Sequence, residues 1–199
     1  VMVTKNGQAK KTEFQEYDSR NSTLVAIKLT DGDELVSVRT TNGQNDFLIF
    51  TRDGQGIRFA ESDLRAMGRS TQGVRGIKLR DGDVVVAAVS NVDGDEVLLL
   101  TSGGYGKRTA MDEFRRQARG GIGVKAYKLT KVRGDLVGAR AVTKDDEVFL
   151  ISSRRTCLSA PATKISRDKK RDSTGVKVVD LAEGSKLTAF AIVHPEEAE

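Results

Sequence analysis

Apolar residues in this chain fall in short runs bounded by turns. Between positions 47 and 90 four such runs predict strands over residues 47–51, 57–60, 73–79 and 84–90. Asp-Gly and Asn-Gly pairs between runs favour tight hairpins, because glycine readily adopts the positive φ that these turns need. A longer polar link, residues 61–71, separates the second run from the third and could hold a short helical turn. The nearly continuous apolar run at 84–89 is typical of a strand covered on both faces.

This pattern recurs about every fifty residues. One anchor is Ile-Lys-Leu at 27–29 and 77–79, followed by Tyr-Lys-Leu at 127–129 and Val-Asp-Leu at 179–181. A second anchor is Thr-Lys-Asn-Gly at 4–7, Thr-Arg-Asp-Gly at 51–54 and Thr-Ser-Gly-Gly at 101–104. The sequence therefore predicts four repeats, which we bound at 1–46, 47–96, 97–147 and 148–193, with an acidic tail at 194–199.

Several four-stranded repeats in series predict an all-β fold, a β-pinwheel or propeller-like array of blades. Kelch arrays also have a period near fifty, and Trp-Asp repeats one in the low forties. Both rely on tryptophan signatures, and this chain has no tryptophan. Its absence counts against a generic protein-interaction propeller.

Composition adds few constraints. The chain has 199 residues and a net charge of +5, with 33 basic and 28 acidic side chains, which suggests a polyanionic partner. Its single cysteine, Cys157, allows no internal disulfide and fits a reducing cytoplasm. No apolar run approaches the roughly 20 residues of a membrane span. Because Val1 lies inside a strand-like run, we expect the chain to be a piece of a longer protein.

The positive charge is concentrated in one repeat. Residues 97–147 carry eleven basic and six acidic side chains, an excess equal to that of the whole chain. Residues 115–125 include three arginines, one lysine and three glycines but no acid. Arginine suits phosphate oxygens, and glycine lets a backbone approach a ligand closely. The alternative for this stretch alone is a tight turn with solvated arginines.

Basic residues also recur at matching places in successive repeats, after the first hairpin and around the third strand. Equivalent positions in a ring of blades share a perimeter, so these cations would form an arc that can follow a curved duplex, mainly by neutralising phosphates. The alternative is a solvated rim. The candidate DNA-binding residues are Lys10, Lys11, Arg58, Arg69, Arg75, Lys107, Arg108, Arg115, Arg116, Arg119, Lys125, Lys169, Lys170, Arg171 and Lys177.

Two segments, 68–83 and 101–109, resemble the C-terminal domain of the DNA gyrase A subunit, and their spacing fits. The resemblance covers all four repeats and is strongest over residues 24–150. It implies a six-bladed β-pinwheel that wraps duplex DNA around a basic outer edge to support ATP-dependent negative supercoiling. It also implies two protein partners, the rest of the gyrase A chain and the gyrase B chain.

Residues 117–123 resemble the family's Gln-Arg-Arg-Gly-Gly-Lys-Gly box. Five of seven positions match, namely Gln117, Arg119, Gly120, Gly121 and Gly123, whereas Ala118 and Ile122 replace basic residues. The family's functional box lies in the first blade, but two repeats precede this copy. The resemblance therefore implies a degenerate box in the fifth blade of six, and a chain that holds the last four blades.

We expect no enzyme in this chain. His194 is the only histidine, Cys157 has no neighbouring histidine in sequence, and no glycine run ends in the Gly-Lys-Ser/Thr of a P-loop. The resemblance implies that the strand-cleaving tyrosine lies outside this chain. We expect no cofactor here, with ATP and Mg²⁺ used by the parent complex. Two alternatives stay open: the topoisomerase IV counterpart, which recognises DNA geometry, and a protein-interaction propeller.

Overall fold

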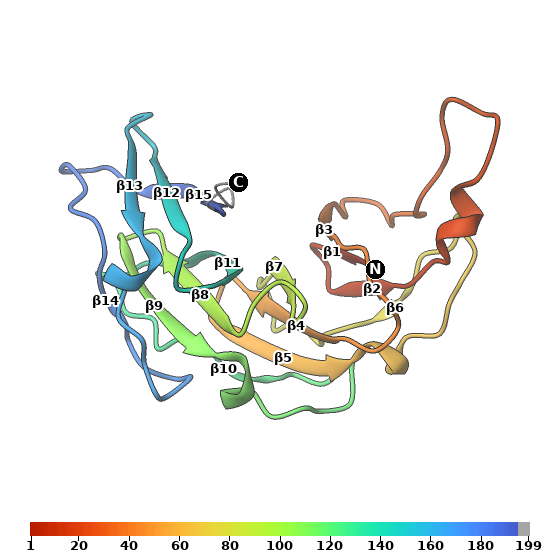
Figure 1. The fold of residues 1–199 in the computed structure, drawn as a ribbon, viewed down its shortest axis with the longest axis horizontal. Coiled ribbons are helices and arrows are strands. Elements are labelled where there is room, and N and C mark those ends of the chain that lie inside the picture. The colour runs from red at the N-terminus through yellow and green to blue at the C-terminus, as the bar shows by residue number, and fades with distance from the viewer. Residues whose placement is uncertain (195–199) are drawn as a thin grey trace.

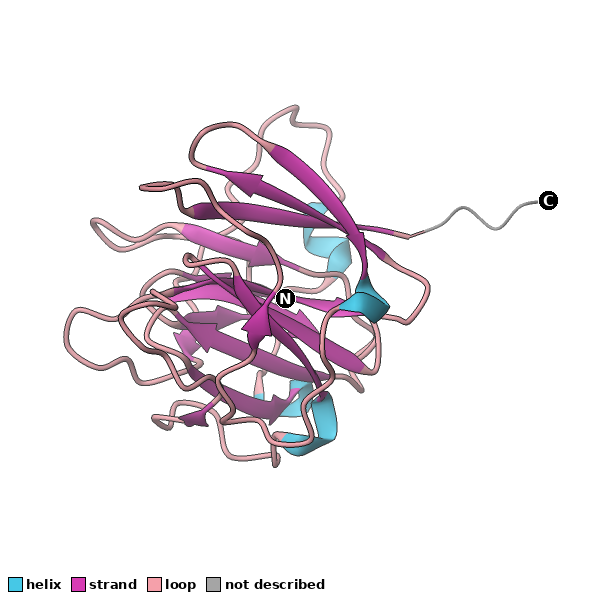
Figure 2. Cartoon of the chain, turned by 90° about the vertical axis from the view of Figure 1, so that its left-hand side faces the viewer, coloured by secondary structure: helices cyan, strands magenta, loops and turns pink. Residues whose placement is uncertain are grey.

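In the computed structural model, which describes residues 1–194, four antiparallel sheets follow one another along an open arc (Figure 1). The strands of these residues are β1 (Met2–Thr4), β2 (Gln8–Lys10), β3 (Leu35–Val38), β4 (Asp46–Thr51), β5 (Gln55–Ala60), β6 (Val74–Arg75), β7 (Val85–Ser90), β8 (Glu96–Thr101), β9 (Tyr105–Ala110), β10 (Val124–Lys125), β11 (Leu136–Val142), β12 (Glu147–Ser152), β13 (Cys157–Pro161), β14 (Val176–Lys177) and β15 (Leu187–Val193). Short 3₁₀ helices follow the hairpins: η1 (Phe14–Tyr17), η2 (Glu61–Asp63), η3 (Met111–Glu113) and η4 (Ala162–Lys164). In Figure 2 these helices lie toward the right-hand ends of the strands, away from the long turns on the left. The predicted all-β fold and the predicted helical turn after the hairpin are confirmed.

Each of the first three sheets takes its outer strand from the following repeat. The strand orders are β3-β1-β2-β6, β10-β5-β4-β7 and β11-β8-β9-β14, and the last sheet is β13-β12-β15. Thus β6 pairs with β2, β10 with β5 and β14 with β9. The strand predicted over residues 73–79 is too long. Only the two residues of β6 form a strand there, because the chain moves away from the edge of β2 after Arg75.

The expectation of four strands in every repeat is wrong for the first one. Residues 24–29, which match β6, β10 and β14 in sequence, form no strand. The physical reason is the exchange itself: this segment would pair with a preceding sheet, and none lies before the first sheet in the described chain. Sequence similarity alone could not show this, since strand pairing depends on a distant partner.

Apolar clusters fill the spaces between consecutive sheets. Side chains alternate along β4, so that Phe47 and Ile49 face the first sheet while Leu48 and Phe50 face the third. The strand is buried along its whole length, which explains its continuous apolar run. A third cluster, around Phe190, joins the last two sheets. On the inner side of the arc β7 contacts β3 and β11, and β11 contacts β15 (Figure 1).

Tight hairpin turns bring each sheet close to the chain that crosses over it. Gly54 has a φ of +79°, and its carbonyl oxygen accepts hydrogen bonds from the N–H groups of Ala126 and Tyr127 at 2.8 and 3.1 Å. A Cβ atom here would lie 2.8 Å from the carbonyl oxygen of Tyr127, so both the turn and the crossing require glycine. Arg155 takes the equivalent place in the last sheet with a φ of +61°.

Candidate nucleic-acid interface

The outer side of the arc is formed by the chain segments that follow the second strand of each repeat and that, in the last three repeats, include the exchanged outer strand (Figure 1). We call residues 14–28, 61–78, 111–128 and 162–179 the linkers. The last three each cross from their own sheet to the outer edge of the preceding one, where isolated parallel bridges join Lys11 to Ala66, Arg58 to Arg116 and Arg108 to Arg167. Consecutive linkers also bond to one another: the N–H of Lys78, for example, donates to Gly121 at 2.8 Å. The rim is therefore a belt of overlapping linkers.

Two predicted DNA contacts, Lys10 and Lys107, are fully buried, so their placement on the exposed rim is wrong. The ammonium of Lys107 donates to the carbonyl oxygen of Arg171 and, at 3.0 Å, to the hydroxyl of Ser173. Burial lowers the pKa of Lys107 to about 8, although Asp168 and Asp172 act in the opposite direction.

Lys10 occupies the equivalent position two sheets earlier, on β2. It donates to the carbonyl oxygens of Ala26 and Arg69, and burial together with the charge of Arg69 lowers its pKa. Both lysines extend from a sheet and bond to a linker through its buried side. Periodicity marked them as equivalent but could not show that the side chains point inward.

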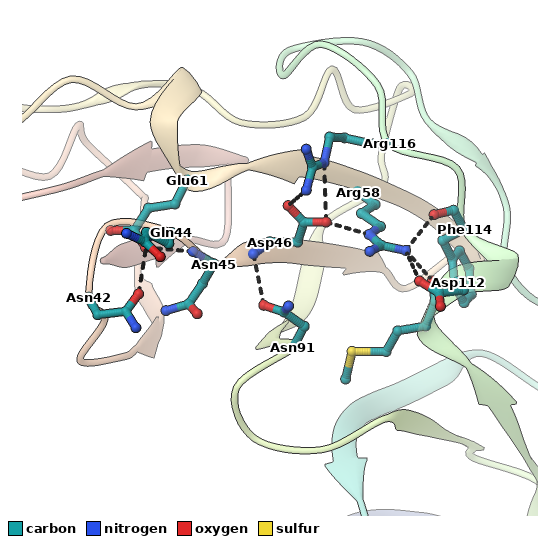
Figure 3. A network of polar contacts seen from close by, with 11 residues as sticks. Asn42, Gln44, Asn45, Asp46, Arg58, Glu61, Asn91, Asp112, Phe114 and Arg116 are labelled. Atoms are coloured by element: carbon teal, nitrogen blue, oxygen red, sulfur yellow. Dashed lines mark hydrogen bonds and ion pairs between the residues drawn. The ribbon is translucent and has the colours of Figure 1, made fainter.

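Arg58 and Arg116 meet at one buried carboxylate, that of Asp46 (Figure 3). Arg58 Nε lies 2.8 Å from Asp46 Oδ2, and Arg116 Nη2 lies 2.7 Å from Asp46 Oδ1. Arg58 also donates to Asp112 at 2.9 Å and to the carbonyl oxygens of Met111 and Phe114. Burial disfavours its charge, but the hydrogen bonds to Asp112 and Asp46 raise the pKa of Arg58 above its usual value. Arg58 thus fastens the third linker to β5.

The next sheet repeats this arrangement with Glu96 as its centre. Arg108 Nη1 lies 2.6 Å from Glu96 Oε2, and Arg167 pairs with the other carboxylate oxygen. In the first sheet Lys11 lies 3.8 Å from the carboxylate of Glu61. The side chains of Arg58, Arg108 and Lys11 are largely covered, whereas Arg116 keeps 61 % of its side chain exposed. Of the predicted residues in these ion pairs, Arg116 alone offers an open surface to a ligand.

Three further predicted residues bond to the backbone of the preceding linker. Arg69 donates to the carbonyl oxygen of Val25, Arg119 to that of Arg75 and Arg171 to that of Lys125. The acceptors are spaced by fifty residues, so this contact is part of the repeat. The three arginines are half-buried.

The residues that match the degenerate box bond to and pack against the preceding sheet and linker. The N–H of Gln117 donates to Arg58 at 2.8 Å, and that of Gly120 donates to Gly76 at 2.7 Å. The carbonyl oxygen of Gly121 accepts from Lys78. A Cβ at Gly123, whose φ is +77°, would overlap the carbonyl group of Gly56 on β5. Here these glycines serve close contact between backbones.

The remaining predicted residues are exposed. Arg75, Lys125 and Lys177 occupy the second position of β6, β10 and β14, so the three outer strands present a cation at the same place. Lys177 is paired with Asp180 at 2.8 Å, which raises its pKa. The other exposed members of the predicted set, all on the third and fourth linkers, are Arg115, Lys169 and Lys170.

Sequence reasoning missed a second row of cations. Lys28, Lys78 and Lys128 are exposed, and each donates its backbone N–H to the following linker. Their spacing of fifty residues could have identified them as equivalent rim positions, but they were used only to align the repeats. Arg167 was also missed, and 57 % of its side chain is exposed.

Two turn aspartates and the histidine have structural partners, whereas the cysteine is free. The carboxylates of Asp33 and Asp83 each accept two backbone N–H groups at their turns, so turn geometry accounts for both side chains. His194 Nδ1 lies 2.6 Å from a carboxylate oxygen of buried Asp146. Cys157 is exposed at the edge of the last sheet. Between residues 1 and 194 there is no cluster of three or more potential metal-ligand side chains, and no helix long and apolar enough to cross a membrane. Apart from His194, the predicted acidic tail lies outside the described residues.

Antiparallel blades that exchange their outer strand, with cations repeated along the perimeter, define a β-pinwheel. The sequence model of the DNA gyrase C-terminal domain, beta-propeller, matches residues 1–42, 45–91, 95–143 and 146–194. The chain belongs to this family.

Relatives and solved structures agree with this assignment. The DNA gyrase A protein of Mycolicibacterium smegmatis is 40% identical over 194 residues, which cover 96% of this chain and 23% of the relative. A structure of a DNA gyrase A C-terminal domain matches with a TM-score of 0.85 and 30% identity, over 96% of this chain and 64% of that one. The C-terminal domain of a DNA topoisomerase IV matches with a TM-score of 0.90 and 27% identity, over 97% of this chain and 61% of that one. The chain thus spans about a quarter of the length of the gyrase A relative.

Proposed function

We propose that this chain is a non-catalytic domain that binds duplex DNA on its linkers and bends it around the outside of the arc. The observation that carries the proposal is the repetition of exposed cations on successive linkers, Arg75, Lys125 and Lys177 in one row and Lys28, Lys78 and Lys128 in the other. Exposed cations at matching places on successive blades present charge along a curve. A duplex that follows this curve brings its phosphates to one linker after another.

Binding of this kind depends on phosphate neutralisation and is tolerant of base sequence. Smooth bending of a 20–30 bp site costs on the order of 1–6 kcal/mol. A single lysine–phosphate contact does not offset that cost, so several linkers must act together. This need for several linkers accords with the spread of the exposed cations over all four linkers.

The salt dependence of binding tests the proposal. Affinity for a duplex of about 30 bp, measured by fluorescence anisotropy over a salt series, should fall with a log–log slope of about −0.9 per phosphate neutralised. The double variant Lys78→Gln/Lys128→Gln should make this slope shallower by about 1.8.

The matched control is Lys144→Gln/Lys186→Gln, which removes the same charge from exposed positions outside the linkers. It should leave the slope close to that of the unsubstituted protein. Affinity that is independent of salt, or equal slope changes in the two double variants, would contradict DNA binding on the linkers. A protein partner captured in a pull-down, together with no DNA affinity at low salt, would favour the interaction propeller.

We further propose that the parent protein is a bacterial gyrase A protein that acts with gyrase B in the cytoplasm. In that complex ATP and Mg²⁺ would be used outside this chain, and the strand-cleaving tyrosine would also lie outside it. The bent DNA would be presented for strand passage, which introduces negative supercoils. Similarity to gyrase A along nearly the whole of this chain supports the assignment.

The TM-score of 0.90 to a topoisomerase IV domain favours a second candidate, recognition of DNA geometry without wrapping. Relaxation of a plasmid by a type I topoisomerase in the presence of the domain separates the two. A chiral wrap leaves a linking-number change of one sign after the protein is removed. Recognition of crossings without wrapping leaves the linking number of relaxed DNA unchanged.

A further inference from the structure

The segments that carry the rim cations are held at both ends by the following linker. At the first end, the guanidinium of Arg119 donates to the carbonyl oxygen of Arg75 at 3.1 Å, and that of Arg171 donates to Lys125 at 2.6 Å. At the other end, the N–H groups of Lys78 and Lys128 donate to the following linker at 2.8 and 3.0 Å. Each four-residue segment, 75–78 and 125–128, thus has a cation at each end and a bond to the next linker at each end.

Arg119 is the more extensively engaged of the two arginines. Its Nε donates to the carbonyl oxygen of Asp63 at 2.9 Å while its Nη1 donates to Arg75, so one planar guanidinium joins two points of the preceding linker. The N–H of the next residue, Gly120, donates to Gly76. Two donors in a fixed fork suit two carbonyl oxygens, and a lysine ammonium does not reproduce that geometry.

Engagement of this kind changes the role expected of these arginines. A side chain whose donors bond to backbone carbonyl oxygens has fewer donors left for phosphates than a free lysine has. Its contribution to binding then comes from the residues it holds, here Arg75 for Arg119 and Lys125 for Arg171.

We propose that Arg119 and Arg171 are positioning residues, which fix the spacing of the rim cations from one linker to the next, and that their own charges neutralise no phosphate. This inference rests on the proposed DNA binding. Each linker would thereby set the position of the cations on the linker before it, and the rim would present its charge at a constant pitch.

The charge-conserving variant Arg119→Lys and the neutral variant Arg119→Gln test the proposal, with Lys128→Gln as the benchmark for a phosphate contact. Arg119→Lys should bind the duplex about three- to tenfold more weakly at every salt concentration, the factor expected for about one net hydrogen bond. Arg119→Gln should show a similar loss with an unchanged salt slope. Lys128→Gln should make the slope shallower by about 0.9.

Two results would overturn the positioning role: wild-type affinity in Arg119→Lys, or a slope change of about 0.9 in Arg119→Gln. Thermal unfolding establishes that each variant is folded, and if Arg119→Gln does not fold, Arg119→Lys decides the question. A salt-independent affinity in the unsubstituted protein would instead refute the proposed function, so the two failures are distinguishable.

Discussion

The buried ammonium of Lys107 predicts an unusual dependence of stability on pH. Its pKa is lowered to about 8 in the folded protein, against an ordinary value of 10.5. Between these values the unfolded chain binds more protons than the folded one, so the free energy of unfolding rises with pH. Because one pKa unit corresponds to about 1.36 kcal/mol, this group should add about 2–3 kcal/mol of stability between pH 7 and pH 10.

The variant Lys107→Met isolates this contribution. Methionine keeps an unbranched chain of similar length without the charge, and Ile57 at the equivalent position of β5 shows that an apolar side chain fits the fold there. Urea unfolding of both proteins at pH 7, 8, 9 and 10 gives the difference in free energy at each pH. Other titrating groups are common to both proteins and cancel in the difference.

Above pH 8, we expect the free energy of unfolding of the unsubstituted protein to rise steadily relative to that of Lys107→Met. The series stops at pH 10, because burial raises the pKa of Tyr127, and above pH 10 ionisation of this tyrosine in the unfolded chain lowers the stability of both proteins. A difference that stays constant from pH 7 to 10, or that falls, would refute the reasoning about Lys107.

Two further predictions concern the attachment of the third linker. Gly123→Ala should destabilise the protein by about 1–3 kcal/mol in thermal unfolding, because of its positive φ and the carbonyl group of β5 that a Cβ would overlap; unchanged stability would contradict this. Asp46→Asn should cost about 2–3 kcal/mol in urea unfolding, since it removes a buried charge that two arginines share. Asp112→Asn, at an exposed carboxylate that also binds Arg58, should cost less than about 1 kcal/mol, and equal costs would argue against the central role of Asp46.

Local patterns in the sequence were sufficient to predict the all-β fold and most of the strands. Apolar runs and Asp-Gly turns are determined by nearby residues, so β4, β5 and β7 lie within a residue or two of the predicted strands. The exchange of β6 into the first sheet was not predictable in this way. It depends on pairing with β2, which belongs to the previous repeat.

The candidate site was predicted less completely, because charge and period do not specify side-chain direction. Lys107 and Lys125 are both basic and both repeat-related, yet one is buried beneath a linker and the other is exposed on β10. Lys78 and Lys128 were visible in the repeat, but they were used only to align the repeats and not considered as ligand contacts. The ion pairs at Asp46 are formed by residues up to 70 positions apart, and no local pattern indicates them.

The exchange of outer strands also determines where this chain can be divided. A fragment that ends at a repeat boundary, for example at residue 96, loses β10 and leaves β5 with an unpaired edge. Unpaired edges of this kind promote pairing with other chains and aggregation. A fragment intended to contain the first two sheets intact must extend through Lys125, into the middle of the third repeat. During synthesis the second sheet likewise stays incomplete until about 65 residues beyond β5 have emerged, so each of the first three sheets depends for its completion on chain that is made later.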